Sequence, residues 1–363
     1  MSQRITSPEG PEMERLCREL QGLCAEADQT GRWPEDAIRF LAESGAIEWY
    51  VPRAYGGQEW DETSLSKAYL ALSEAFLSAT FILTQWAGAC RRIAGCENES
   101  LKERLLPGLL TGETFATVGI SHLTTSRRHL ARPALTAEKV EGGYLLNGYA
   151  PWVTGAEKAD RVVTGAVLLE NDEPTPLQML VAAPTDNTAV KTPEPFSMVA
   201  LTSSRTGPVE FDGLMIGEED VVAGPVEEVM KSGVGAKPGG TQTSALALGS
   251  ARASIRILER EALRRPELEE VAQAMLAEHK EAISHLEASC TQEPTCSTEA
   301  LRQKANSLVL RASQAALTAT KGAGYLGDAP AGRLCREALF FLVWSCPAPV
   351  QNANLCELAG LAD

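Results

Sequence analysis

The hydrophobic periodicity of this chain changes twice along its length. Over residues 11–110, apolar residues recur at steps of three and four, the spacing that places them on one face of a helix. Over residues 114–222, short apolar runs alternate with turn residues, as in β-strands. Long alanine- and leucine-rich segments follow and predict further helices. The expected domains are an N-terminal helical domain (1–113), a central β domain (114–225) and a C-terminal helical bundle (226–363).

Local signals refine this order. Helices are expected to resume near Ser64 after a turn rich in proline and glycine. Asn147-Gly148 favours a two-residue hairpin turn, because both residues tolerate positive φ. The glycine-rich stretch 233–240 lacks the P-loop spacing and is interpreted as a linker. The C-terminal helices are expected at 243–264, 266–290 and 298–321.

The charge balance restricts the possible partners. The chain has 48 acidic and 33 basic side chains and a formal net charge of −15, a surface that repels phosphate backbones and anionic lipid. We therefore expect no nucleic-acid binding. An anionic coenzyme would need a local basic cluster, and the densest one is Arg127, Arg128 and Arg132.

Cysteine and histidine usage points to a reduced, metal-free protein. The nine cysteines are scattered without CxxC spacing, and the N-terminus lacks a basic segment followed by an apolar stretch, so we expect free thiols and a cytoplasmic location. No apolar run approaches the roughly 20 residues that cross a bilayer. His279 and His285 lie among glutamates on a helical stretch and are expected to face solvent.

Four stretches, spread over nearly the whole chain, carry a family resemblance. The first two are GAIEWYVPRAYGG (45–57) and LPGLLTGE (106–113). The third and most specific is YLLNGYAPWVTGAEKAD (144–160), and the fourth is GAGYLGDAPAGRLCREA (322–338). Together with the helix–sheet–helix order, these stretches are similar to the acyl-CoA dehydrogenase family.

The resemblance implies a multidomain α+β fold with an N-terminal helical domain, a central β-barrel-like domain and a C-terminal four-helix bundle. It also implies FAD as cofactor, an acyl thioester substrate, and a homodimer or homotetramer assembled through the C-terminal helices. Trp152 and Thr154 would lie against the flavin ring, as a flat apolar wall and a hydrogen-bonding hydroxyl. The alternative is a core tryptophan beside a strand threonine.

The fourth stretch leaves two interpretations open. Arg333 and Arg336 match the family's arginine pattern, with Glu337 in place of the usual aspartate. They are equally compatible with solvated arginines on a surface helix.

The expected catalytic base is missing. The family takes the substrate α-proton with a glutamate, because abstraction beside a thioester needs a positioned base of suitable pKa. Here the segment is WSCPAP (344–349), and Ser345 occupies the base position, where a hydroxyl is a poor base without an activating neighbour. Some family members carry the base on an earlier helix, but Gln242 and Thr243 at that place are not acidic.

The flavin-contact turn is also altered. It reads GISHLTTS (119–126), in which Ser121 keeps a hydroxyl where the family has threonine. His122 is a candidate proton-transfer residue because its ordinary pKa lies near neutrality, although a histidine in a turn is more often a structural hydrogen-bonder.

The family's cofactor pattern across the subunit interface is not recognisable in 262–273.

Three functions are compatible with these sequence features. The first is a flavin-dependent oxidoreductase acting on an acyl thioester by α,β-dehydrogenation or a close variant. The second is a flavin-dependent monooxygenase on the same fold, which would tolerate Ser345. The third is a non-catalytic binding protein of that fold.

Overall fold

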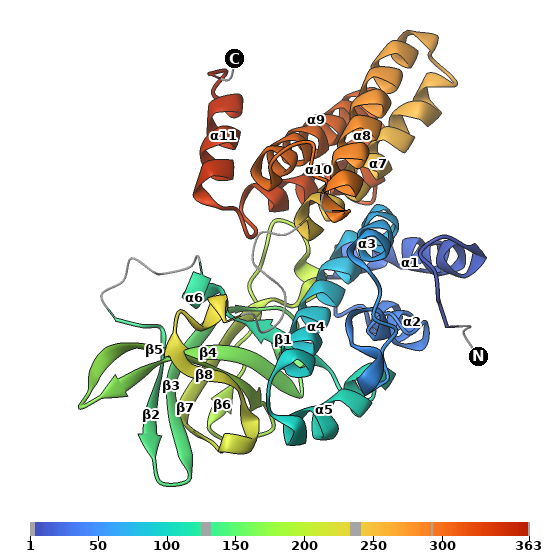
Figure 1. Ribbon diagram of the computed structural model, residues 1–363. Helices are drawn as coiled ribbons and strands as arrows, with labels where there is room; N and C mark the ends of the chain where they lie inside the picture. Colours follow the sequence, from blue (N-terminus) through green and yellow to red (C-terminus); the bar gives the residue numbers. More distant parts are fainter. Residues whose placement is uncertain (1–3, 125–131, 233–240, 292, 362–363) are drawn as a thin grey trace.

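The computed structural model describes residues 4–124, 132–232, 241–291 and 293–361. Arg127, Arg128, His129 and the stretch 233–240 lie outside the described residues. In Figure 1 the N-terminal helices lie beside the sheet, and the C-terminal helices lie above both.

The N-terminal part is helical, and its boundaries follow from capping and amphipathic spacing. Helix α1 buries Met13, Leu16 and Leu20, a spacing of three and four residues. Asp61 accepts a hydrogen bond from the backbone of Ser64 and so caps α3. The helices are α1 (Pro11–Thr30), α2 (Glu35–Glu43), α3 (Glu62–Ala75), α4 (Leu77–Gly95) and α5 (Glu99–Thr111), with short 3-10 helices η1 (Glu48–Tyr50) and η2 (Arg53–Tyr55).

The middle of the chain forms one eight-stranded sheet in the order β6-β7-β3-β2-β4-β5-β8, with β1 paired to β4. The strands are β1 (Ala116–Gly119), β2 (Leu135–Val140), β3 (Gly143–Val153), β4 (Arg161–Glu170), β5 (Glu173–Pro184), β6 (Val190–Lys191), β7 (Gly207–Ile216) and β8 (Val221–Glu227). The short helices of this part are α6 (Ser121–Thr124), η3 (Ala156–Lys158), η4 (Thr202–Ser204), η5 (Glu218–Asp220) and η6 (Val229–Lys231). Helix α4 packs against β1 and joins the helical part to the sheet.

The predicted hairpin turn at Asn147-Gly148 is wrong. Both residues lie inside β3, and the turn between β2 and β3 falls at residues 141–142. The register between β3 and β7 shifts after Leu146, and Asn147 Oδ1 accepts a 2.8 Å hydrogen bond from the Gly213 amide. Gly148 has a φ of 121°, and a Cβ there would lie 2.2 Å from the carbonyl oxygen of Ala134. The Asn-Gly pair therefore lies at a β-bulge in β3 and does not form a turn.

The C-terminal part is a helical bundle, and the three long helices expected from the sequence are present. The elements are α7 (Gln242–Ala262), η7 (Pro266–Leu268), α8 (Glu269–Cys290), α9 (Thr298–Gly324), α10 (Pro330–Ala338), η8 (Leu339–Leu342) and α11 (Ala348–Leu358). Helices α8, α9 and α10 pack against α7, and α11 contacts α9. The solvent-facing position expected for His279 is wrong, because its imidazole is buried and Nε2 lies 3.1 Å from the carbonyl oxygen of Leu248.

Helix α10 of the bundle contacts the N-terminal helices through an ion pair. Arg336 forms an ion pair with Asp28 of α1 instead of extending freely into solvent. Glu337 is buried nearby, and burial raises the pKa of its carboxyl against the attraction of Arg333. Arg336 of the fourth sequence stretch therefore contributes to the contact between α10 and α1.

Candidate functional site

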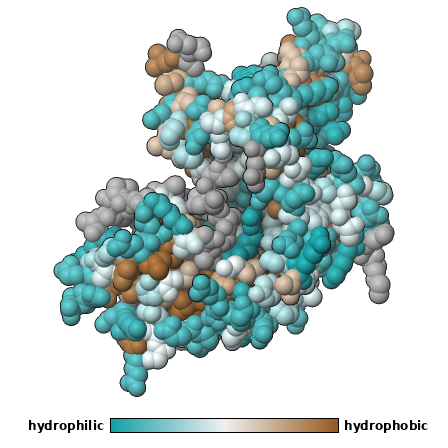
Figure 2. Space-filling model, viewed as in Figure 1, coloured by the Kyte–Doolittle hydropathy of each residue, from teal (hydrophilic) through white to brown (hydrophobic). Residues whose placement is uncertain are grey.

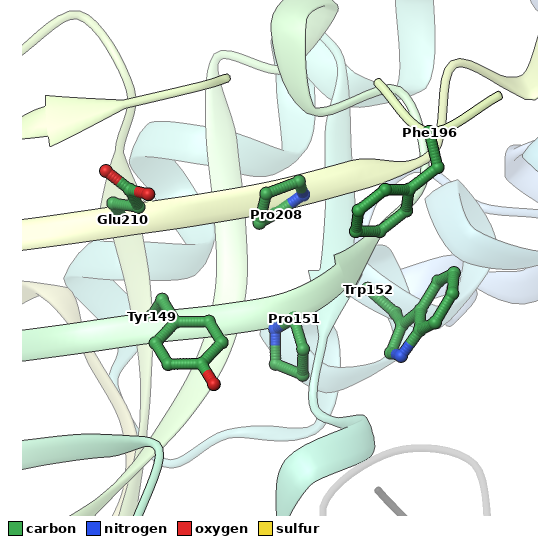
Figure 3. A pocket seen from close by; sticks show the side chains of 6 residues that line it. All are labelled: Tyr149, Pro151, Trp152, Phe196, Pro208 and Glu210. Carbon is green, nitrogen blue, oxygen red and sulfur yellow. The ribbon is translucent and has the colours of Figure 1, made fainter. Parts of the chain in front are cut away.

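An aromatic side chain stands exposed at the end of β3. Trp152 is 48% exposed, whereas the core tryptophans Trp49 and Trp86 are almost fully buried. Its ring lies 4.7 Å from that of Phe196 between centroids, tilted by 54° (Figure 3). The register of β3 against β7 shifts between Ala150 and Val153, next to Trp152. The alternative of a core tryptophan is therefore wrong.

Trp152 belongs to an open surface pocket of about 370 Å³ on β3 and β7. Figure 3 shows the two large rings at one end, Tyr149 and Glu210 at the other, and two prolines between them. The lining residues are Tyr149, Pro151, Trp152, Phe196, Pro208 and Glu210. A surface of aromatic and proline faces suits a flat, apolar ring. Its one charged lining residue is a carboxylate, which disfavours a phosphate group at that end.

Thr154 lies just beyond the end of β3, and its hydroxyl faces other hydroxyls. The side chain is 3% exposed, and Oγ1 lies 3.1 Å from Oγ1 of Thr206. Thr206 Oγ1 in turn lies 2.9 Å from Oγ of Ser204. The structure therefore brings Trp152 and Thr154 to one strand end, with Trp152 exposed and Thr154 held in a buried hydrogen-bonded group.

Ser121 opens the short helix α6, which packs against β3. Its Oγ is buried and has no hydrogen-bond partner within the described part of the chain. An unpaired buried hydroxyl costs about 1–3 kcal/mol, so a bound group that pairs with it would be stabilised.

The neighbouring His122 is engaged with the sheet. Its Nε2 lies 2.7 Å from the carbonyl oxygen of Gly165 on β4, so Nε2 carries the hydrogen and donates. Nδ1 is buried without a partner among the described residues. Burial lowers the pKa of His122, which favours the neutral imidazole. Any proton transfer by His122 would therefore have to use Nδ1.

The loop that carries Ser345 offers no carboxylate. Ser345 is exposed and has a φ of 45°. Next to it, burial raises the pKa of the Cys346 thiol, against the effect of the buried Arg302, so the sulfur stays protonated at neutral pH. Thr243, at the alternative base position on α7, is buried. The missing catalytic glutamate stays a prediction from the sequence.

The described residues hold no group of three or more His, Cys, Asp or Glu side chains arranged for a metal ion. Within the same residues, no helix combines the length and the hydropathy needed to cross a bilayer.

Comparison with known proteins shows which proteins the chain is similar to in sequence and in fold. Residues 13–113 match the family model described as acyl-CoA dehydrogenase, N-terminal domain. Glutaryl-CoA dehydrogenase of Desulfococcus multivorans is 25% identical over 203 residues, which are 54% of this chain and 51% of that relative. Over its N-terminal helices, this chain is similar to the acyl-CoA dehydrogenase family. The sequence match thus spans about half the length of this curated relative.

Solved structures of acyl-CoA dehydrogenases match almost the whole chain. The glutaryl-CoA dehydrogenase complex with glutaryl-CoA has a TM-score of 0.79 at 18% identity, covering 98% of this chain and 96% of that one. Butyryl-CoA dehydrogenase from Megasphaera elsdenii has a TM-score of 0.78 at 17% identity, covering 97% of each chain. These likenesses confirm the predicted fold, with helical domains on either side of a central β domain.

Sequence analysis does not identify several residues of this candidate site. Phe196, Ser204, Thr206 and Glu210 all come from the segment that leads into β7 or from β7 itself. Their sequence carries one usable signal, the cluster of four hydroxyl residues in LTSSRT (201–206). The pairing of β3 with β7 decides that this cluster lies at the end of β3.

Proposed function

We propose that this chain is a flavin-dependent oxidoreductase that acts on an acyl thioester, with FAD as its cofactor. One observation carries the proposal: the half-exposed Trp152 ring lies on the same strand end as Thr154, at the positions where the family contacts flavin. The names of the relatives, glutaryl-CoA dehydrogenase among them, support an acyl thioester as the substrate class.

The described side chains suit the ring of a flavin. Trp152 would cover one face of the ring and exclude water from it, and Phe196 would support the indole. The hydroxyl of Ser121, which has no partner among the described residues, and the hydroxyl of Thr154 would form hydrogen bonds with the polar edge of the ring. Bound FAD supplies the capacity to accept a hydride from the substrate. The phosphates would lie away from Glu210, and Arg132 belongs to the predicted basic cluster.

Dehydrogenation also needs an acceptor for the α-proton. Ser345 is a hydroxyl without a described activating partner, and Cys346 is a protonated thiol. We therefore infer that the proton passes to a group outside loop 343–347.

The proposed assembly is a homodimer or homotetramer formed through the C-terminal helices. Figure 2 shows hydrophobic side chains gathered near the free end of α11. Leu355, Leu358 and Leu361 in this region are each more than half exposed. Burying them against a second copy would remove apolar surface from water. The nine cysteines are all unpaired, which supports the proposed cytoplasmic location.

The decisive experiment is the visible absorbance of purified protein after incubation with excess FAD and removal of free dye. We expect flavin bands in stoichiometric amount, followed by reduction of the flavin by an acyl-CoA in a substrate screen. Trp152→Ala should weaken FAD binding by about tenfold, because stacking on an aromatic ring contributes about 0.5–1.5 kcal/mol beyond buried area.

Met215→Ala is the matched control, because Met215 is a 49% exposed hydrophobic residue of β7 outside the pocket lining. This control should bind FAD as the wild type does. A wild-type protein that stays colourless under saturating FAD would refute the proposal.

A further inference from the structure

Three buried hydroxyls form a chain behind the proposed ring-binding surface. Thr154 Oγ1, Thr206 Oγ1 and Ser204 Oγ are joined by separations of 3.1 and 2.9 Å. The three side chains are 3%, 6% and 0% exposed, respectively. Water therefore does not compete for these hydrogen bonds, and we call this group the hydroxyl chain.

Backbone contacts hold the hydroxyl chain in place. The amide of Gly155, which follows Thr154, donates to the carbonyl of Ser204 at 2.9 Å. The amide of Phe196, the ring partner of Trp152, donates to the carbonyl of Thr206 at 2.9 Å. One short segment therefore positions both the indole wall and the Thr154 hydroxyl.

Counting protons gives the hydroxyl chain a direction. Each hydroxyl has one proton, so two hydrogen bonds among three hydroxyls leave one proton over. A leftover proton on Ser204 or Thr206 would be buried, and the described residues offer it no further acceptor. Thr154 is equally buried, but it follows directly on the strand end that bears Trp152, where the polar edge of the proposed flavin ring would accept its proton. Burying an unpaired donor is costly, so Ser204 donates to Thr206, and Thr206 donates to Thr154.

We infer that Ser204 and Thr206 are positioning residues that orient Thr154 as a hydrogen-bond donor toward the polar edge of the flavin ring. This inference rests on the proposed function. A donor at that edge stabilises the electron-rich reduced ring more than the oxidised one, so the hydroxyl chain raises the reduction potential of the bound flavin.

The test compares Thr206→Val, which removes the hydroxyl at nearly constant shape, with Thr206→Ser, which keeps it. FAD affinity is measured by absorbance titration and the midpoint potential by dye equilibration, with the melting temperature of each apoprotein as a check on folding. Thr206→Val should bind FAD about fivefold more weakly, the effect of one hydrogen bond, and its potential should be more negative. Thr206→Ser should stay near the wild type in both measurements.

Ser204→Ala provides a second variant, since it removes the donor to Thr206 from the far end of the hydroxyl chain. Its potential should shift in the same direction as that of Thr206→Val. Adding Thr206→Val to Thr154→Val should cause no further shift, because the relayed hydroxyl is already gone.

The outcomes separate the two proposals. If the wild type binds FAD and Thr206→Val leaves both affinity and potential unchanged, the positioning role is wrong and the proposed function stands. Equal losses in Thr206→Val and Thr206→Ser would also overturn it, because the hydroxyl would then not be the cause. If the wild type binds no FAD, the proposed function fails and the inference fails with it.

Discussion

Gly119 ends β1 at a point where the backbone lies directly against Val153, the residue between Trp152 and Thr154. A Cβ at position 119 would lie 2.8 Å from Val153 Cγ2, 3.1 Å from Ala150 Cβ and 3.3 Å from Val162 Cγ1. Ordinary carbon contacts are about 3.5–4.0 Å, so Gly119→Ala requires movement of a fully buried, β-branched side chain.

Forcing one extra methyl into a packed core typically costs about 1–3 kcal/mol, and we expect Gly119→Ala to lose that much free energy of unfolding. The displaced Val153 should also shift the proposed ring-binding surface, so FAD affinity should fall in the same variant. Urea denaturation followed by circular dichroism measures the first effect, and absorbance titration measures the second.

Two further variants make the test of Gly119→Ala specific. Gly22→Ala on α1 meets no heavy atom within 4 Å and should be neutral or stabilising by up to about 1 kcal/mol, through helix propensity. Combining Gly119→Ala with Val153→Ala removes the 2.8 Å contact, so the double variant should be less destabilised than the sum of the single ones. A Gly119→Ala protein as stable as the wild type would refute this account of the packing.

Three shorter predictions concern pH, the domain contact and assembly. Burial lowers the pKa values of His122 and His279, so at mildly acidic pH the unfolded chain binds more protons than the folded protein. The free energy of unfolding should therefore fall as pH drops below about 6.5. His279→Gln should make this fall with pH less steep, as measured by urea titrations at several pH values. A double-mutant cycle on Asp28 and Arg336 should give a coupling of about 1 kcal/mol or less, because the pair is partly exposed; zero coupling would mean that the ion pair does not stabilise the domain contact. Leu358→Asp should lower the mass measured by light scattering toward that of a monomer, and a wild type that is already monomeric at micromolar concentration would contradict the proposed assembly.

The sequence predicted the helices most successfully where the signals were local. The segment 298–321 was expected as a helix, and α9 spans Thr298–Gly324, with Ser297 capping its first turn. The prediction of a hairpin turn at Asn147-Gly148 is wrong because this dipeptide suits a β-bulge as well as a turn. Which of the two forms depends on the pairing of β3 with β7, which is distant in sequence. His279 was placed in solvent because its sequence neighbours are glutamates, whereas its imidazole meets the backbone of α7.

The sequence by itself determined the helix–sheet–helix order and the resemblance to a known family, because hydrophobic periodicity and short motifs depend on residues close together in the chain. It also marked Trp152 and Thr154, but not their surroundings. Only the tertiary structure decided that Trp152 is exposed beside Phe196, and that Thr154 shares a hydrogen bond with Thr206, 52 residues further along the chain. Such contacts depend on the strand register between β3 and β7, which no local pattern of this sequence specifies.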